Sequence, residues 1–210
     1  PNNMSVERKK TLELYGAELI EVDAGAFDDA ISLRDKMCED NGWFNCNQFN
    51  NPLNVESHRE GTAVEILHQC RNICIEPSAL ISGTGTGGTI MGVGPMLNMY
   101  YPNMDIVAVE PSESPVMSGG EPGLHGIQGI GDGSKFLVDL TVVDKIITIS
   151  TEDAKLRARK LAKEHGMFVG ISAGSNILAA ESYVEKYNPD ELYLKKIIFK
   201  LKKNKSRISL

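Results

Sequence analysis

Apolar and polar positions along this chain follow two patterns, one typical of helices and the other typical of strands. Apolar residues separated by charged ones predict helices over residues 5–16, 27–39, 58–69, 87–100, 151–165 and 174–187. Short apolar runs predict strands over residues 17–22, 43–45, 79–82, 105–109, 142–149 and 168–171. Because helices and strands alternate, the pattern predicts an α/β fold in which helices cover both faces of a parallel sheet.

Two segments interrupt this alternation and indicate how the chain is organised. Residues 45–54 hold five Asn, one Gln and a Pro, so we expect a loop there and a domain crossover near residue 51. Residues 112–133 are rich in Gly, Pro and Ser, and a connection of that length is usually functional or disordered. The expected division is a domain at residues 1–51, a second domain at residues 52–190 and a basic tail at residues 191–210.

The strongest chemical signal is the turn at residues 82–89, Ser-Gly-Thr-Gly-Thr-Gly-Gly-Thr, which follows a predicted strand and begins a predicted helix. Glycines let the backbone approach a ligand closely, and the free N–H groups at the start of a helix favour an anion. The hydroxyls of Thr84, Thr86 and Thr89 add further donors. The turn therefore predicts a phosphate-binding site.

Spacing alone leaves a second interpretation of this turn open. Gly83, Gly85 and Gly88 satisfy the dinucleotide pattern G-x-G-x-x-G, and Glu110 ends the next strand, where a ribose-binding acid would lie. A nicotinamide-dependent enzyme is therefore an alternative. A tight turn without any ligand is the least favoured interpretation, because the glycines and threonines exceed what a bare turn needs.

A second turn of small residues, 170–175, also follows a predicted strand and precedes a helix. Ligands of open parallel sheets bind at the carboxyl ends of the strands, so both turns are expected to face one pocket. Ser172 in this turn could donate to a ring atom of a ligand or cap the helix. From spacing alone, the capping role is favoured.

Composition narrows the function classes further. The chain has 22 Lys and Arg against 28 Asp and Glu, and this net charge of −6 argues against general binding to nucleic acid or to an anionic membrane. It has no apolar run long enough to cross a bilayer and no signal-peptide pattern at its start. Four cysteines in 210 residues favour reduced thiols and a cytoplasmic protein. The four histidines lack a metal-ligand pattern, so we expect no metal and assign them to the surface or to loops.

Four segments together resemble the cysteine synthase (O-acetylserine sulfhydrylase) family and its relative cystathionine β-synthase. They are Asn-Gln-Phe-Asn-Asn-Pro at 47–52, the glycine turn at 83–89, Val-Glu-Pro-Ser-Glu-Ser-Pro at 109–115 and Gln-Gly-Ile-Gly at 128–131. The resemblance runs from about residue 3 to about residue 187. It implies three-layer parallel-sheet domains of the tryptophan synthase β-like type (fold type II). Residues 1–51 would then be the remainder of the small substrate-loop domain, and residues 52–190 the large domain.

The resemblance implies pyridoxal 5′-phosphate (PLP) as the cofactor and gives roles to individual residues. The loop that grips the cofactor phosphate matches Gly85, Thr86, Gly87, Gly88 and Thr89. Ser172 matches the serine that hydrogen-bonds the pyridine nitrogen, where a neutral partner favours β-elimination. Substrate-binding positions match Gln48, Gly129, Ile130 and Gly131. Glu110 becomes a structural residue at a strand end, so the nicotinamide alternative explains only the first turn.

The implied reaction is cysteine biosynthesis by PLP-dependent β-replacement, from O-acetylserine or a related serine derivative and sulfide. The resemblance also implies a homodimer in the parent enzyme and serine acetyltransferase as a partner. The Schiff-base lysine of the family precedes the segment that matches residues 4–7, and no lysine of this chain has a matching context. The chain therefore resembles an N-terminally truncated cysteine synthase that is inactive alone, and it is assigned no catalytic residue.

Two departures from the family leave alternatives open. Residues 191–210 are basic and unlike the end of the family's sequences. Residues 173–175, Ala-Gly-Ser, resemble the form found in cystathionine β-synthase. The alternatives are a cystathionine β-synthase-like enzyme and a non-catalytic binding protein with the PLP fold.

Overall fold

The computed structural model describes residues 1–187. Within them, three parallel strands form one sheet in the order β1-β2-β3: β1 (Ala79–Gly83), β2 (Asp105–Pro111) and β3 (Lys145–Ile149). Parallel neighbours cannot be joined by a tight hairpin, so the chain crosses over after each strand. These crossovers bring the carboxyl ends of all three strands to the same edge of the sheet.

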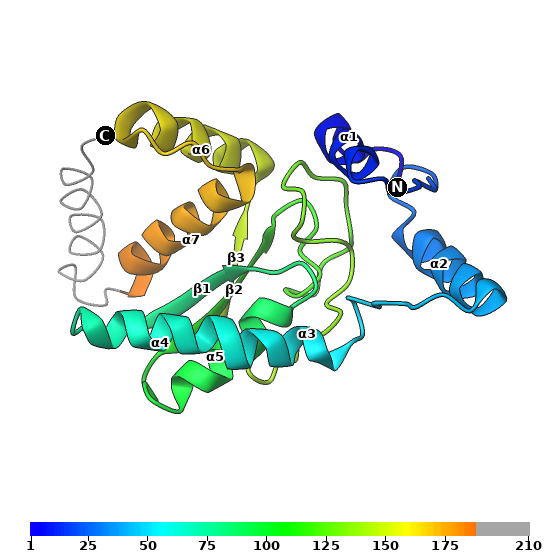
Figure 1. Cartoon of the computed structure of the whole chain (residues 1–210). Coiled ribbons are helices and arrows are strands. Elements are labelled where there is room, and N and C mark those ends of the chain that lie inside the picture. The colour runs from blue at the N-terminus through cyan, green and yellow to red at the C-terminus, as the bar shows by residue number, and fades with distance from the viewer. Residues whose placement is uncertain (188–210) are drawn as a thin grey trace, which may run out of the picture.

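Helices cover both faces of this sheet (Figure 1). On one face lie α5 (Gly88–Asn98) and a long helix that runs through α3 (Pro52–Ser57), a π-helical turn η1 (His58–Thr62) and α4 (Ala63–Asn72). On the other face lies α7 (Ile171–Tyr187), which packs against α6 (Thr151–His165). The predicted α/β fold with a covered parallel sheet is confirmed.

The core divides between the two faces because successive strand residues point to opposite sides. Ile106 and Ala108 of β2 pack with the buried side chains of α5, among them Val93 and Leu97. Val109 faces the other way and packs in the α6–α7 layer. Each face thus has its own apolar cluster, and β2, the middle strand, is buried on both.

Three of the predicted strands are wrong. Residues 17–22 and 43–45 form neither helix nor strand, and residues 168–170 form the connection between α6 and α7. A strand exists only when its backbone finds a ladder partner, and short apolar runs carry no information about that partner. Phe168 is 98% exposed, so an apolar residue in such a run need not be buried.

Two other boundaries differ for local reasons. The long helix begins at Pro52 and not at residue 58, because Oδ1 of Asn51 accepts the N–H of Leu53 at 3.0 Å and caps the helix. Strand β3 begins at Lys145, three residues later than predicted. The carboxylate of Asp144, the residue before β3, accepts a hydrogen bond from the N–H of Ile106 at 2.7 Å, so pairing with β2 starts only after this residue.

Helices α1 (Val6–Leu14) and α2 (Phe27–Asn41) lie to one side of the sheet (Figure 1). Neither helix has a buried residue. The domain boundary near residue 51 stays a prediction, and the tail at 191–210 lies outside the described residues. Within residues 1–187, none of the helices is long and apolar enough to span a bilayer.

Candidate functional site

The glycine-rich turn lies where β1 ends and α5 begins. Gly87 has a left-handed backbone, with φ of 88°, and is the N-cap of α5. Among residues 1–187, the backbone N–H groups of Gly85, Thr86 and Gly87 meet no hydrogen-bond acceptor. Because these amides stand at the positive end of the α5 dipole, the turn is suited to bind an anion such as a phosphate.

Close contacts explain why positions 85 and 88 of the turn are glycines. A Cβ on Gly85 would lie 2.4 Å from the carbonyl oxygen of Gly129, and a Cβ on Gly88 would lie 1.9 Å from Oδ1 of Asn54. Neither distance leaves room for a methyl group. The turn therefore packs directly against the loop at 128–131 on one side and against the long helix on the other.

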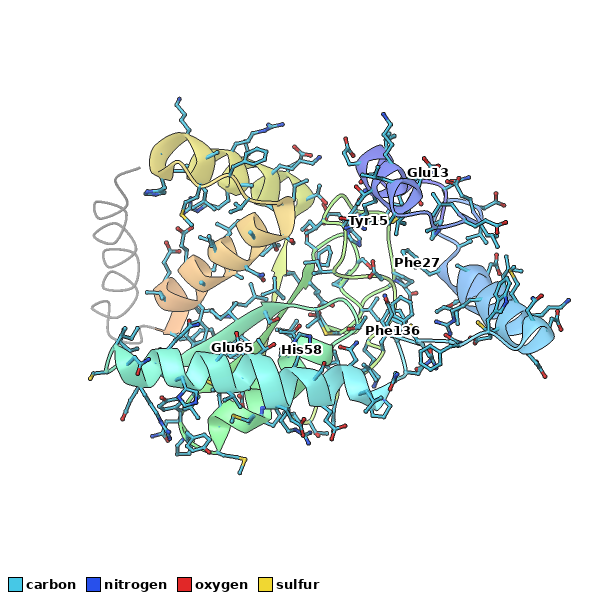
Figure 2. The ribbon with its side chains drawn as sticks, viewed as in Figure 1. Glu13, Tyr15, Phe27, His58, Glu65 and Phe136 are labelled. Carbon is cyan, nitrogen blue, oxygen red and sulfur yellow. The ribbon has the colours of Figure 1, made fainter. Side chains whose placement is uncertain are left out.

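The loop before α3 is attached to the same turn. Nδ2 of Asn54 donates to Oγ1 of Thr86 and to the carbonyl oxygen of Gln48, both at 3.0 Å. The ring of Phe49 packs on that of Phe136, labelled in Figure 2, with the centroids 4.4 Å apart. Gln48 therefore belongs to a segment that is fastened beside the turn, and its side chain is exposed.

His58 is a residue of this site that the sequence did not reveal. The expected place was the surface or a loop, but His58 is half-buried in the long helix (Figure 2). Its Nε2 lies 3.2 Å from Oγ1 of Thr89, and its Nδ1 lies 2.9 Å from Oγ1 of Thr62. Only the packing of α5 on the long helix brings it to the turn, so no sequence signal could have identified it.

The second small-residue turn begins α7. The favoured capping role of Ser172 is wrong, because the helix begins at Ile171 and Ser172 lies inside its first turn. In the described part of the chain, the Ser172 hydroxyl has no hydrogen-bond partner, which leaves it available to a ligand. Oδ1 of Asn176, one helical turn later, accepts the N–H of Gly83 at 2.7 Å. Both turns therefore meet at the carboxyl edge of the sheet.

The loop at 128–131 lines a cavity of about 860 Å³ between residues 122–134 and the N-terminal segments, and among the described residues neither the glycine turn nor the Ser172 turn lines it. Its wall includes residues 24–29 and, from the loop and its neighbours, His125, Gln128, Gly129, Gly131 and Asp132. Ile130 instead packs in the apolar cluster beneath and is 5% exposed. Gln128 and the loop backbone thus face the cavity, and the Ile130 side chain anchors the loop.

Asp132 is the acid of this cavity that lies nearest to the glycine turn. One oxygen of its carboxylate is 3.9 Å from the position of a Cβ on Gly85. Burial raises the pKa of Asp132, and the charges of His125 and Arg8 offset part of that rise. Ionised Asp132 is therefore a cost to the folded state.

The sign of this pKa shift leads to a stability prediction for Asp132→Asn. A carboxyl with a raised pKa in the folded state loses stability as the pH rises from the unfolded value, 3.8, through the folded value. The variant, which cannot ionise, should therefore melt at a higher temperature than the parent at neutral pH, with the gain vanishing below pH 3.8.

A matched control has the opposite sign. Hydrogen bonds from Thr141 lower the pKa of Asp139, so Asp139→Asn should lose stability at neutral pH and recover it in acid. Melting temperatures of the parent and both variants across this pH range are the measurement. A pH-independent difference for Asp132→Asn would show that the burial of its charge is not what matters.

Glu110 is fully engaged in holding the loop that follows β2. Its carboxylate is buried and accepts the N–H of Met117 at 2.7 Å, and the N–H and hydroxyl of Ser118 at 3.0 and 2.5 Å. It has no freedom to bind a ribose hydroxyl. The structural role expected from the resemblance fits this geometry. The alternative of a nicotinamide-dependent enzyme is weakened, because Glu110 is not available as its ribose-binding acid.

The described residues hold no group of three or more His, Cys, Asp or Glu side chains that could ligate a metal ion. The site is instead a set of backbone amides and hydroxyls at one edge of the sheet. Its parts are an anion-binding turn, an available serine hydroxyl and a loop that lines a cavity. This combination suits a small phosphorylated organic ligand.

Comparisons with known proteins agree with this chemistry. Cysteine synthase from Staphylococcus aureus is 43% identical over 184 residues, which are 86% of this chain and 58% of that protein. The crystal structure of cysteine synthase (OASS) from Entamoeba histolytica has a TM-score of 0.76 and 40% identity, over 85% of this chain and 53% of that one. The crystal structure of an O-acetylserine dependent cystathionine β-synthase from Helicobacter pylori has a TM-score of 0.80 and 30% identity. The match covers 89% of this chain and 60% of that one.

The chain thus spans little more than half the length of these relatives. On the side of this chain, the model of the family described as pyridoxal-phosphate dependent enzyme matches residues 1–195. This range includes the glycine turn, the 128–131 loop and the Ser172 turn. The chain belongs to the family of pyridoxal-phosphate dependent enzymes.

Proposed function

We propose that this chain binds PLP and takes part in cysteine biosynthesis from an activated serine, such as O-acetylserine, and sulfide. The observation that carries the proposal is the set of backbone N–H groups at Gly85, Thr86 and Gly87, which meet no acceptor in the part of the chain that the structure describes. They stand at the same sheet edge as the unpartnered Ser172 hydroxyl. A phosphate at the first position and a ring nitrogen at the second fit this pair of donors.

In the proposed site, the residues of the chain bind and orient. Residues 85–89 hold the phosphate through backbone N–H groups and the hydroxyls of Thr86 and Thr89. Ser172 donates to the pyridine nitrogen and leaves the ring uncharged. When bound, the cofactor supplies an electron sink for bond breaking at the α and β carbons of the amino acid. Gln48 and residues 129–131 would hold the substrate, Gly129 and Gly131 from the cavity wall and Ile130 by fixing the loop.

Further parts of the proposal rest on the resemblance and on the composition of the sequence. They are a homodimer, serine acetyltransferase as a partner, a cytoplasmic location and the domain division at residue 51. No residue of this chain is proposed as catalytic.

A cystathionine β-synthase-like enzyme is the second candidate, because residues 173–175 have that form and the Helicobacter pylori structure is similar. The two candidates differ in the nucleophile. In the protein isolated from its source, formation of cysteine from O-acetylserine and sulfide is expected. Formation of cystathionine from homocysteine, with no cysteine from sulfide, would favour the second candidate.

The site itself is tested with pyridoxamine 5′-phosphate, which has no aldehyde and so needs no lysine to bind. Equilibrium dialysis with the 210-residue chain should show one saturable site, and pyridoxamine without its phosphate should bind far more weakly. Since no lysine has a matching context, PLP followed by borohydride should label no lysine uniquely. Failure to bind pyridoxamine 5′-phosphate would contradict the proposed cofactor site, and a uniquely labelled lysine would contradict the missing catalytic residue.

A further inference from the structure

Three segments of the proposed site converge on one backbone position, Gly83, the last residue of β1. Its N–H donates to Oδ1 of Asn176 on α7 at 2.7 Å, although the two residues are 93 positions apart in the sequence. A Cβ on Gly83 would lie 3.2 Å from that same oxygen and 3.0 Å from Cγ2 of Ile130. The phosphate turn, the Ser172 helix and the loop at 128–131 therefore meet at this glycine.

Apolar packing already joins β1 and α7, since Ile81, Ile171 and Leu178 share one cluster, but the hydrogen bonds of the phosphate turn and of α7 are otherwise separate. Thr84 is held by β2, since its N–H and its hydroxyl both donate to the carbonyl oxygen of Val109, at 3.0 and 3.1 Å. Helix α7 is held by α6, where Arg157 pairs with Glu181. Among the described residues, the Asn176 bond is the one side-chain hydrogen bond that joins α7 to residues 79–89.

A ligand that binds both the phosphate turn and the Ser172 hydroxyl depends on the hydrogen bond between Gly83 and Asn176. The phosphate of PLP is joined to the pyridine ring by a short ester arm, so the turn at 85–89 and Ser172 must be held within a narrow range of separations for one molecule to reach both. Asn176 follows Ser172 by one turn of helix α7. Gly83 lies two residues before Gly85, the first of the residues proposed to hold the phosphate. A bond between Asn176 and Gly83 fixes the separation.

We infer that Asn176 is a positioning residue, which holds the Ser172 hydroxyl at the distance from the phosphate turn that the cofactor requires. The inference rests on the proposed function. It assigns Asn176 no contact with the ligand, because its side-chain oxygen is occupied by Gly83. Its effect is confined to ligands that span both donors.

The test compares a spanning ligand with one that fills only the turn. Asn176→Leu keeps the size of the side chain but removes the acceptor. Its affinity for pyridoxamine 5′-phosphate should fall about tenfold, the equivalent of one hydrogen bond, whereas its affinity for inorganic phosphate should change less than about twofold. Asn176→Asp keeps an acceptor oxygen and should restore most of the affinity for pyridoxamine 5′-phosphate.

Asn98→Leu is the matched control. Oδ1 of Asn98 is buried at the far end of α5 and has no hydrogen-bond partner within residues 1–187, so this change should leave both affinities unaltered. If Asn176→Leu does not fold, Asn176→Ala removes the same acceptor without adding an apolar branch. The ratio of its affinities for pyridoxamine 5′-phosphate and inorganic phosphate is then compared with that of the unmutated chain. Far-ultraviolet circular dichroism establishes that each variant is folded before binding is measured.

The outcomes separate the inference from the proposed function. A loss confined to pyridoxamine 5′-phosphate and recovered by Asn176→Asp is the expected result. Equal losses for both ligands, or no loss for either, would overturn the positioning role while the cofactor site stands. An unmutated chain that binds inorganic phosphate but not pyridoxamine 5′-phosphate would overturn the proposed function, and the inference with it.

Discussion

Replacing Gly87 with Ala is expected to abolish binding of inorganic phosphate and to lower the free energy of unfolding by about 2–5 kcal/mol. Gly87 has a φ of 88°, a region that costs a residue with a side chain about 1–2 kcal/mol. Its Cβ would also lie 2.6 Å from Cγ2 of Val138 and 3.0 Å from the backbone nitrogen of Val138. Overpacking of that kind adds about 1–3 kcal/mol.

Loss of phosphate binding follows from the place of Gly87 in the turn. Relief of the clash with Val138 moves the backbone that presents the N–H groups of Gly85, Thr86 and Gly87. Anion binding by backbone amides depends on their common direction, which a shifted backbone would lose. Phosphate binding by isothermal titration and unfolding by urea are the two measurements.

Two glycines of this chain serve as matched controls. Gly119 has a similar φ of 85°, but a Cβ there would meet nothing within 4 Å, so Gly119→Ala should cost only the backbone strain. Gly170 has neither a positive φ nor a near neighbour, so Gly170→Ala should be close to neutral. Equal destabilisation by the changes at 87 and 119, or retained phosphate binding in Gly87→Ala, would contradict the close-contact argument.

Glu110→Ala is expected to destabilise the fold by about 2–4 kcal/mol, although Glu110 touches no proposed ligand. The change leaves the buried N–H of Met117 without its acceptor at 2.7 Å and opens a cavity where a fully buried side chain lay. An unsatisfied buried donor alone costs about 1–3 kcal/mol. The midpoint of urea unfolding should fall accordingly.

The effect of Glu110→Ala should extend to the phosphate turn. Sδ of Met117 lies 3.5 Å from Oγ1 of Thr84, and the carbonyl oxygen of Thr84 accepts the N–H of Gly131 at 2.9 Å. Weaker phosphate binding should therefore accompany the loss of stability. Glu121→Ala is the control, because Glu121 is an exposed acid of the same long loop and should change stability by less than about 0.5 kcal/mol. A Glu110→Ala chain as stable as the control would show that the carboxylate does not hold the loop.

Much of the site could be predicted from the sequence because its signals are local. Helix α6 has the predicted bounds, Thr151–His165, since Ser150 caps it by accepting the N–H of Asp153 and Gly166 ends it with a φ of 63°. The phosphate turn is recognisable because glycine, threonine and a following helix are adjacent in the sequence. The α/β alternation is likewise a property of neighbouring residues.

Only the tertiary structure decided which distant residues serve the turn. Asn54, His58 and Asn176 reach it from two helices on opposite faces of the sheet, and nothing in their own neighbourhoods distinguishes them from other polar helix residues. Their contacts depend on the packing of whole elements.

The same distinction explains the errors. Residues 17–22 and 43–45 have the composition of strands, but a strand is defined by a partner elsewhere in the chain. The substrate-binding role of the 128–131 loop stays a prediction, and only the packing shows that the Ile130 side chain anchors this loop in the core. Hydrogen bonds and apolar contacts between near neighbours follow from the sequence by itself, whereas those between distant residues depend on how the layers pack.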